Sequence, residues 1–326
     1  MRPSLATRLL TAEVVARLMA LADVDPSRVV NDFRAPQAVA ALREAEVIIS
    51  CWGCPPLSHS VLANAPRLRA VIHAAGSVKR HVTTACWQRG IQVSSATWAN
   101  TVPVDEYVLA AILFANKQFL QIRDDQRLSR PPVNWRTTYR DLGNYRRVIG
   151  LVGASRISLR VIEFLRLHDF ELLLFDPCVP PVQEPALGTR TVELDELCMR
   201  SDVVSVHAPD LPATRHMIDR HHLSLMCDGA TLINTVGGSL VDPDALTAEL
   251  RRGRLHAVLD LTVPEVLPTD SPLYDLSHVL LAPQVAGLLG SGLHRMAEAA
   301  LNELDRYTDG LPFAHPIRQQ DLVRIP

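Results

Sequence analysis

The sequence is poor in glycine and almost free of lysine. A typical chain of 326 residues would contain roughly 23 glycines, but this one contains 15. Of its 33 basic residues only Lys79 and Lys117 are lysines, and the formal net charge is −2. Nucleic-acid binding needs a concentrated basic surface, so this charge balance predicts no nucleic-acid partner. The shortage of glycine matters because nucleotide-binding loops depend on glycine.

Long hydrophobic runs are also missing. The longest uninterrupted apolar run, 107–115, is far shorter than the roughly 20 residues of a membrane helix. Charged side chains at Arg8, Glu13 and Arg17 interrupt the apolar core that a signal peptide needs. The six cysteines are scattered through a long chain, which is typical of reduced thiols. We therefore expect a cytoplasmic protein without a membrane segment.

Short β-type runs alternate with helical patterns in the first part of the chain. Runs at 47–50, 68–73 and 91–94 predict a small parallel sheet. A long apolar helix is predicted from Pro103 to Leu120, with the proline in its first turn. The arginine-rich stretch 123–147 has no clear period, which indicates a connector or an arm that contacts a partner.

The alternation restarts at Val148 and continues to about residue 281. The expected strands lie at 148–152, 171–175, 203–207, 230–234, 257–260 and 279–281. Strands joined by helical crossovers predict a doubly wound parallel sheet, which binds ligands beyond the carboxyl ends of its strands. A last helix is expected from Leu293 to Thr308.

The segment after the strand at 148–152 has the layout of a dinucleotide-binding fingerprint with two defects. In the pattern G-x-G-x-x-G the glycines allow a tight turn, approach of the backbone to the pyrophosphate, and close packing of helix on strand. Gly153 keeps the first position, but Ser155 and Ser158 occupy the others. The side chain of Ser155 takes space that a pyrophosphate would use, although its hydroxyl can donate to a phosphate.

Asp176 follows the next expected strand, at the place where a fingerprint has its acidic residue. It would accept a hydrogen bond from a ribose 2′-hydroxyl and repel a 2′-phosphate, which predicts NAD in preference to NADP. The loop alone leaves another interpretation open, a strand-turn-helix that binds nothing.

Four stretches resemble the D-2-hydroxyacid dehydrogenase family, and they run along nearly the whole chain. They are 150–177, 201–209 with Thr214, 232–242, and 259–260 through 282–287. The resemblance implies two Rossmann-like or flavodoxin-like doubly wound α/β domains with parallel sheets and a cleft between them. The substrate domain would be discontinuous, 1–102 plus 298–326, and the NAD-binding domain would be 103–297. The family also implies a homodimer.

The same resemblance implies three catalytic groups, of which this chain keeps one. In the family an arginine in N-T-x-R-G binds the substrate carboxylate, a histidine in P-H-x-A/G exchanges the proton, and a glutamate keeps that histidine protonated. Gly237 stands at the arginine position, Gln284 at the histidine position, and Glu265 is retained. Glutamine exchanges no proton near neutral pH, so we expect no efficient oxidation of a simple 2-hydroxy acid.

Further positions of the site are implied by the resemblance. On the substrate side they are Trp52, Ala75, Gly76 and Ser77. The cofactor positions are Gly153, Ser155, Arg156, Ile157, Asp176, His207, Pro209, Thr214, Thr235, Val236, Asp260 and Gly287. No metal is expected, because the C-x-x-C pair of Cys51 and Cys54 has no second pair and is interpreted as a structural loop.

Several residues could replace the lost proton donor. His73 and Lys79 lie near the expected substrate side, and a desolvated lysine would support imine chemistry. Glu265 either acts as a base, if it is buried, or makes a hydrogen bond to Gln284. For His207 a structural or cofactor role is favoured over catalysis.

Three functions remain open at this point. The first is an NAD(H)-binding enzyme on an oxidoreductase scaffold whose substrate lacks the usual 2-hydroxy acid group. The second is a conventional NADH-dependent 2-oxoacid reductase that uses another acid or a solvent proton. The third is a non-catalytic, NAD-sensing or structural homodimer. The serines of the glycine loop favour the third, whereas Asp176 and Glu265 favour the first two.

Overall fold

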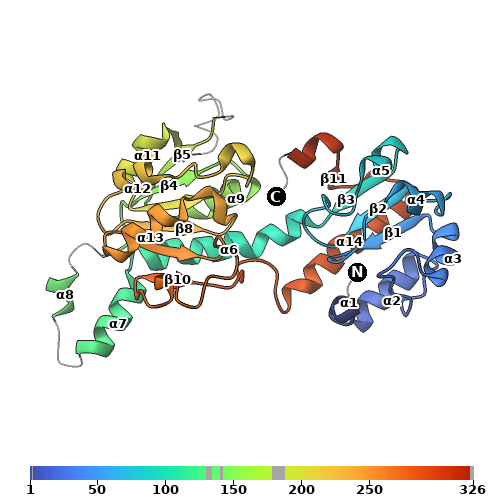
Figure 1. Cartoon of the computed structure of the whole chain (residues 1–326), viewed down its shortest axis with the longest axis horizontal. Helices are drawn as coiled ribbons and strands as arrows, with labels where there is room; N and C mark the ends of the chain where they lie inside the picture. The colour runs from blue at the N-terminus through green and yellow to red at the C-terminus, as the bar shows by residue number, and fades with distance from the viewer. Residues whose placement is uncertain (2, 130–133, 140–141, 178–187, 324–326) are drawn as a thin grey trace. The chain divides into compact units, whose positions relative to one another are not determined.

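The computed structural model describes the chain except residues 2, 130–133, 140–141, 178–187 and 324–326 (Figure 1). The described residues form two units. Unit 1 comprises 1–101 and 288–326, and unit 2 comprises 102–287. The second boundary lies at 288, where the sequence predicted 298, because Leu288 and Leu293 already pack into the core of unit 1.

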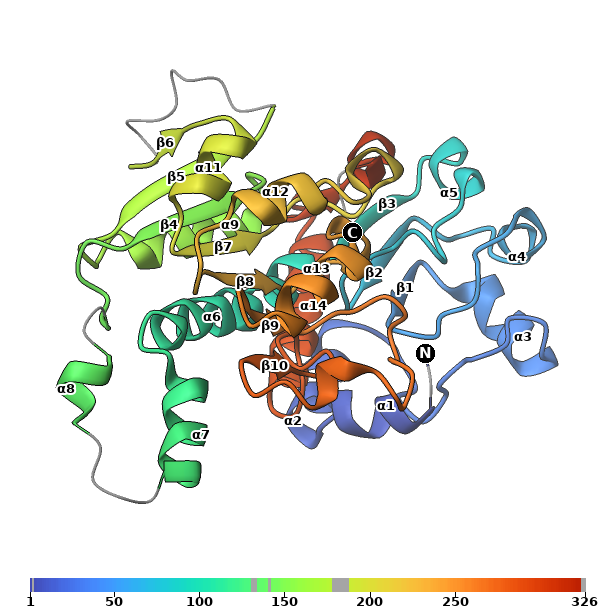
Figure 2. The ribbon, with the colours of Figure 1, turned by 60° about the vertical axis from the view of Figure 1, so that its left-hand side comes forward.

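Unit 2 is built on a sheet whose order in the described residues is β10-β9-β8-β7-β4-β5-β6. The strands are β4 (Val148–Val152), β5 (Glu171–Phe175), β6 (Arg190–Thr191), β7 (Val203–Val206), β8 (Thr231–Asn234), β9 (His256–Leu259) and β10 (Val279–Leu281), all parallel. Figure 2 shows β5, β4, β7 and β8 side by side. The direction of winding reverses between β4 and β7, and this switch point is where such sheets bind ligands.

Helices cover both faces of this sheet, because its central strands are apolar on both faces. They are α6 (Thr97–Ala115), α9 (Arg156–Leu165), α11 (Leu194–Arg200), α12 (Arg220–Leu225) and α13 (Pro243–Arg251). In β5, Leu172 and Leu174 belong to the cluster that contains α6 and α9. Leu173 belongs to the cluster with α11, α12 and α13. The unit is therefore doubly wound, as predicted.

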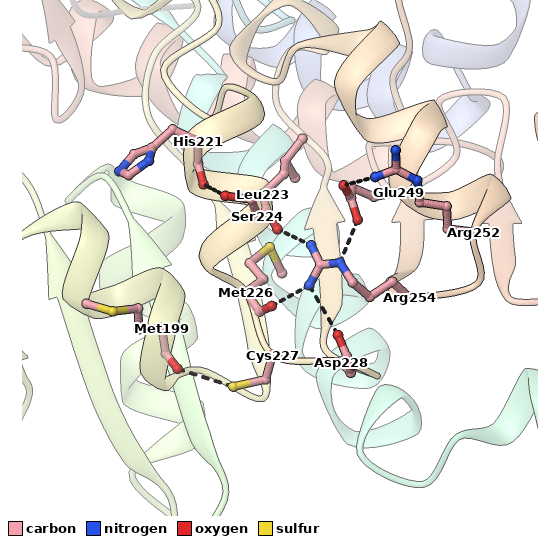
Figure 3. Close-up of polar contacts among 10 residues, drawn as sticks. All are labelled: Met199, His221, Leu223, Ser224, Met226, Cys227, Asp228, Glu249, Arg252 and Arg254. Atoms are coloured by element: carbon pink, nitrogen blue, oxygen red, sulfur yellow. Dashed lines mark hydrogen bonds and ion pairs between the residues drawn. The ribbon is translucent and has the colours of Figure 1, made fainter.

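A half-buried ion pair between Arg254 and Glu249 fixes the end of α12 beside α13 (Figure 3). Arg254 donates hydrogen bonds to the main-chain oxygens of Leu223 and Met226, which are carbonyls that a helix end leaves unpaired. Its guanidinium also pairs with the buried carboxylate of Glu249, which pairs with Arg252 as well. These contacts tie the end of α12 to α13 and therefore serve the fold.

Unit 1 contains the smaller sheet, in the order β1-β2-β3-β11. The strands are β1 (Val47–Ser50), β2 (Ala70–His73), β3 (Gln92–Ser95) and β11 (Pro316–Ile317). The first three are parallel, as predicted, whereas β11 pairs antiparallel with β3. Because β11 has only two residues, it leaves no alternation in the sequence that could predict it.

Both faces of the unit 1 sheet are covered as well. Ile72 of β2 packs in a cluster with α1 (Pro3–Leu9), α2 (Ala12–Leu21) and α14 (Gly292–Thr308). Val71 packs in a cluster with α3 (Pro36–Glu44), α4 (His59–Ala63) and α5 (Thr84–Gln88). Short 3-10 helices are η2 (Pro212–Thr214), η3 (Gly238–Leu240), η4 (Pro272–Tyr274) and η5 (Gln319–Val323).

The helix predicted in the middle of the chain was wrong at both ends. Helix α6 runs from Thr97 to Ala115, not from Pro103 to Leu120, so that Pro103 lies inside it. The residues before the proline pack into the core of unit 1, where Ala99 is buried and Trp98 is partly buried, and this packing holds the start of the helix. The stretch 123–147, predicted to be a connector or an arm, starts within α7 (Phe119–Ser129) and includes α8 (Trp135–Thr138). Among the described residues no helix is both long and apolar enough to cross a membrane.

Candidate functional site

The loops after β4 and β7 meet at the switch point of the unit 2 sheet. Gly153 has a φ of +98°, and a Cβ atom built there would lie 2.5 Å from the amide nitrogen of Ala208. A side chain therefore has no room, and the left-handed backbone also favours glycine. The retained glycine of the fingerprint is thus required by the packing of unit 2 itself.

The two serines of the fingerprint lie at the start of α9 and take part in its hydrogen bonding. Ser155 is its N-cap, and the Oγ atom accepts a hydrogen bond of 3.4 Å from the amide of Ser158. Ser158 is buried, and its hydroxyl donates to the carbonyl oxygen of Gly153, so close packing is reached without a third glycine. The hydroxyl proton of Ser155 and the first-turn amides of Arg156 and Ile157 remain able to bind an anion at the positive end of the helix.

Asp176 lies directly after β5, as predicted. Its Oδ2 atom accepts a hydrogen bond of 2.7 Å from the amide of Ala154 in the loop after β4. This bond fixes a negative charge beside that loop. A carboxylate in this place attracts hydroxyl donors and repels phosphate.

Two buried polar side chains near these loops lack partners within the described residues. His207 follows β7 with 1% of its surface exposed, and neither ring nitrogen makes a hydrogen bond. Burial lowers the pKa of His207 to about 3, so its ring is neutral near pH 7. Thr235 follows β8, and its buried Oγ1 atom is also unpaired. Buried polar groups are normally paired, so both positions fit a bound dinucleotide that would supply partners.

Hydrogen bonds stabilise the loops that contain other predicted cofactor positions. The Oγ1 atom of Thr214 donates a hydrogen bond of 2.6 Å to the carbonyl oxygen of Pro209. The side chain of Asn234 accepts from the amide of Val236 at 3.2 Å and donates to the carbonyl oxygen of Gly237 at 2.9 Å. These bonds close the turns after β7 and β8 before any ligand is present.

Asp260 organises the segment that carries Gln284. Its carboxylate is buried and accepts hydrogen bonds from the amides of Val285 at 2.7 Å and Ala286 at 3.1 Å. Burial raises the pKa of Asp260, and these two amides oppose the rise. Asp260 therefore positions this segment, which ends with the half-exposed Gly287 as the last residue of unit 2.

The retained glutamate is not in the surroundings expected for a base. Glu265 is exposed, and so is Gln284, whose backbone has a φ of +54°. No hydrogen bond joins their side chains in the described residues. Glu265 is therefore not buried, as a base with a raised pKa would be, and within the described residues it makes no hydrogen bond to Gln284.

A carboxylate fills the space beside the expected arginine position. The backbone of Gly237 is extended, with a φ of −161°, so its conformation alone does not require glycine. A Cβ atom at this position would lie 2.5 Å from the Oδ2 atom of Asp210, in the loop after β7. Ser239 donates its hydroxyl hydrogen bond to the Oδ1 atom of the same carboxylate. Asp210 was not among the predicted site residues, although an acidic residue directly after Pro209 was a visible signal.

The predicted substrate residues of unit 1 lie after neighbouring strands of its sheet. Trp52 follows β1 and is 39% exposed. After β2, Ala75 is buried, Gly76 is half-buried and Ser77 is exposed. The carbonyl oxygen of Gly76 accepts a hydrogen bond of 3.0 Å from Thr97, which fixes this loop against the start of α6.

His73 is a core residue and not an accessible proton donor. Its side chain is 2% exposed, and its Nδ1 atom lies 2.9 Å from the hydroxyl of Ser50. The Oγ atom of Ser50 also lies 3.3 Å from the Nε2 atom of His81. Burial, helped by the neighbouring His81, lowers the pKa of His73 to about 3. Lys79 is exposed, so its amine lacks the desolvation that imine chemistry needs.

The cysteines of the C-x-x-C pair are free and poorly suited to redox exchange. Cys51 is buried, and its thiol donates to the carbonyl oxygen of Ala74 at 3.0 Å. Burial raises the pKa of both Cys51 and Cys54 to about 11. Thiol exchange needs the thiolate form, which is scarce near pH 7 at such values.

Comparisons with known proteins identify the family of the chain. Residues 109–286 match the family "D-isomer specific 2-hydroxyacid dehydrogenase, NAD binding domain". D-3-phosphoglycerate dehydrogenase of Mycobacterium leprae is 30% identical over 76% of this chain and 46% of that protein, so the chain spans about half the length of this relative. Glyoxylate reductase of Korarchaeum cryptofilum is 31% identical over 83% of this chain and 82% of that protein. The crystal structure of D-lactate dehydrogenase from Aquifex aeolicus, complexed with NAD and lactic acid, has a TM-score of 0.65 and 26% identity, covering 93% of this chain and 94% of that one.

Proposed function

The chain belongs to the D-isomer specific 2-hydroxyacid dehydrogenase family, and from this premise we propose that it is an NAD(H)-dependent oxidoreductase whose substrate is not a simple 2-hydroxy acid. The observation that carries the proposal is the carboxylate of Asp210, which lies against Gly237 at the position where the family resemblance implies an arginine. A site that bound a substrate carboxylate would need a cation there.

The cofactor side of the proposal rests on the loop after β4. The first turn of α9 and Asp176 would hold the diphosphate and ribose, and bound NAD(H) supplies a hydride acceptor or donor. Asp176 supports NAD over NADP, because its charge would repel a 2′-phosphate. The unpaired His207 and Thr235 would gain partners.

The reaction side differs from the family in charge and in proton transfer. A substrate carboxylate would be repelled by Asp210, since like charges 4 Å apart cost about 1 kcal/mol even in water. Gln284 has no transferable proton, and general acid–base catalysis typically supplies roughly 10² to 10⁴ in rate. That factor corresponds to roughly 3 to 5 kcal/mol of barrier.

Rebuilding the site tests this proposal. The combined variant Gly237→Arg, Gln284→His and Asp210→Ala should oxidise NADH with glyoxylate or hydroxypyruvate about 10²-fold faster than the unmodified protein. The double variant that keeps Asp210 is the matched control and should gain less, because a side chain at 237 collides with that carboxylate. Rapid turnover of either 2-oxoacid by the unmodified protein would contradict the proposal and favour a conventional reductase.

A further inference from the structure

Three side chains with metal-binding atoms meet on the surface of unit 1. They are Glu13 of α2 and the pair His294 and Glu298 of α14. One ligand atom from each side chain lies within 4.8 Å of the other two, and within the described residues no other group of three histidine, cysteine or acidic side chains meets this condition. The imidazole and the two carboxylates are thus gathered where a single ion can contact all three.

The two helices that carry these side chains are held together on both sides of the group. Beneath it, Leu18 of α2 packs in one apolar cluster with Leu301 of α14. One turn after Glu13, Arg17 donates a hydrogen bond of 2.8 Å to the side chain of Asn302. The backbones are therefore fixed, and rotation of the side chains is sufficient to bring the three ligand atoms onto one ion.

The spacing within α14 suits a tetrahedral ion. His294 and Glu298 are about one helical turn apart, so their side chains lie on the same face. The Nε2 atom of His294 is 3.5 Å from the Oε1 atom of Glu298, which is longer than an ordinary hydrogen bond between nitrogen and oxygen. Two ligand atoms that each lie about 2.0 to 2.1 Å from a tetrahedral zinc ion are about 3.3 to 3.4 Å apart. The pair therefore already has nearly the separation that a shared zinc ion requires.

No lysine or arginine balances the two carboxylates. Within the part of the chain that the structure describes, Glu13 makes no ion pair, and the ion pair of Glu298 is with His294. Arg17 lies 3.7 Å from Asp305 instead. Neighbouring carboxylates repel each other, and a divalent cation between them removes this repulsion. The three side chains are exposed or half-buried, so an ion can reach them from solvent.

We propose that Glu13, His294 and Glu298 bind a divalent transition-metal ion, for which zinc is the best match. Imidazole and carboxylate are common zinc ligands, and zinc accepts three protein ligands with water in the fourth position. Magnesium and calcium prefer oxygen ligands, so the histidine selects against them. The bound ion would tie α2 to α14 and stabilise unit 1.

The metal site is independent of the proposed function, because all three ligands belong to unit 1 and none is a predicted cofactor or substrate residue. No metal was expected from the sequence, since Glu13 lies near the start of the chain and the other two ligands lie near its end.

Zinc binding to the full chain tests the site. The protein would be freed of metal with a chelator and titrated calorimetrically with Zn²⁺ near pH 7.5, because ligation needs the neutral form of imidazole. We expect a tight equivalent of Zn²⁺, an unfolding temperature that rises with bound zinc, and much weaker binding of Mg²⁺ and Ca²⁺. An absence of zinc binding by the folded protein would overturn the proposal, and so would equal affinities for Zn²⁺ and Mg²⁺.

Single substitutions identify the ligands. His294→Gln and Glu13→Gln should each weaken tight zinc binding about tenfold or more, since loss of a residue that only supports a ligand already costs about 10- to 100-fold in metal affinity. His221→Gln is the matched control, because it removes an exposed histidine that lies 3.1 Å from a single carboxylate, that of Asp195. It should leave the tight equivalent unchanged.

Either ligand substitution can contradict the site. Unchanged zinc affinity in His294→Gln would mean that zinc binds elsewhere on the protein. Unchanged affinity in Glu13→Gln would mean that zinc does not join α2 to α14. Circular dichroism of each variant would confirm that it is folded, which is expected because the substituted side chains are not buried.

Discussion

The cofactor positions and the reaction positions of unit 2 differ in how they are held. Gly153, Ser158 and His207 are buried, and the packing of the sheet edge depends on them. Glu265 and Gln284 are exposed, and no side-chain hydrogen bond is described for either. Substitution of a packed residue costs stability, whereas an exposed residue can change at little cost. Changes at Glu265 and Gln284 should therefore disturb the fold less than a change at Gly153.

The largest effect on stability is expected at a buried carboxylate of unit 2. Asp105 in α6 is fully buried, and neither carboxylate oxygen makes a hydrogen bond in the described residues. The nearest cation, Arg160, is 3.9 Å away. Burial raises the pKa of Asp105 from 3.8 to about 7.

Because the folded pKa is raised, the stability linked to Asp105 is present below about pH 4 and is lost as pH rises toward 7. This difference between the folded and unfolded pKa of Asp105 corresponds to about 4 kcal/mol in the free energy of unfolding. Asp105→Asn should therefore unfold at higher urea than the unmodified protein at pH 8, and the gap should close toward pH 4. Parallel pH profiles of the two proteins would contradict this prediction, because they would mean that Asp105 has the same pKa in the folded and unfolded states.

A smaller loss is expected where the two loops meet. Gly153→Ala should lower the free energy of unfolding by about 2 to 3 kcal/mol, because it adds strain and a clash with Ala208. Gly229→Ala is the control, since Gly229 also has a positive φ, +81°, but open space around its Cβ site. It should cost only about 1 kcal/mol in the same urea titration. Equal losses would show that the close approach of the loops is unimportant.

Asp176 should affect the cofactor and not the fold. Asp176→Asn keeps an acceptor for the amide of Ala154 but removes the charge. We expect NADH to bind about tenfold more weakly and its advantage over NADPH to shrink. Fluorescence titration with both cofactors measures this, and an unchanged ratio would mean that Asp176 does not select between them.

The smallest effect is expected at the exposed reaction positions. Glu265→Gln and Gln284→His should each change the free energy of unfolding by no more than about 0.5 kcal/mol. Chemical denaturation near pH 7 is sufficient to check this. A loss of stability well above about 0.5 kcal/mol at either position would mean that Glu265 or Gln284 contributes to the fold, as the buried cofactor positions do.

Most strands could be predicted because apolar runs bounded by polar residues mark them clearly, and the spacing from Gly153 to Asp176 indicated the cofactor loop. The start of α6 could not be predicted. Proline is typical of a first helical turn, but the residues before Pro103 also continue the helix because Ala99 packs in the core of unit 1. His73 was proposed as a proton donor because it precedes the loop that contains Gly76. The sheet order places β2 between β1 and β3, which buries that histidine, and no local pattern reveals this order.

Asp210 was not among the predicted site residues, because its position directly after Pro209 does not by itself reveal which residues it reaches. Its carboxylate matters only because the loops after β7 and β8 lie side by side, so that it reaches Gly237 and Ser239. Such contacts between distant parts of the chain depend on tertiary structure. For the same reason, rebuilding the site requires a change at Asp210 as well as at Gly237 and Gln284.

The central claim is that the cofactor site is kept while the reaction site is altered, and a calorimetric titration of the unmodified protein with NADH tests its first half directly. We expect saturable binding with a dissociation constant well below about 1 mM, within the range common for enzyme ligands, and weaker binding of NADPH. No heat of binding at millimolar NADH, under conditions in which the protein is folded, would contradict the account.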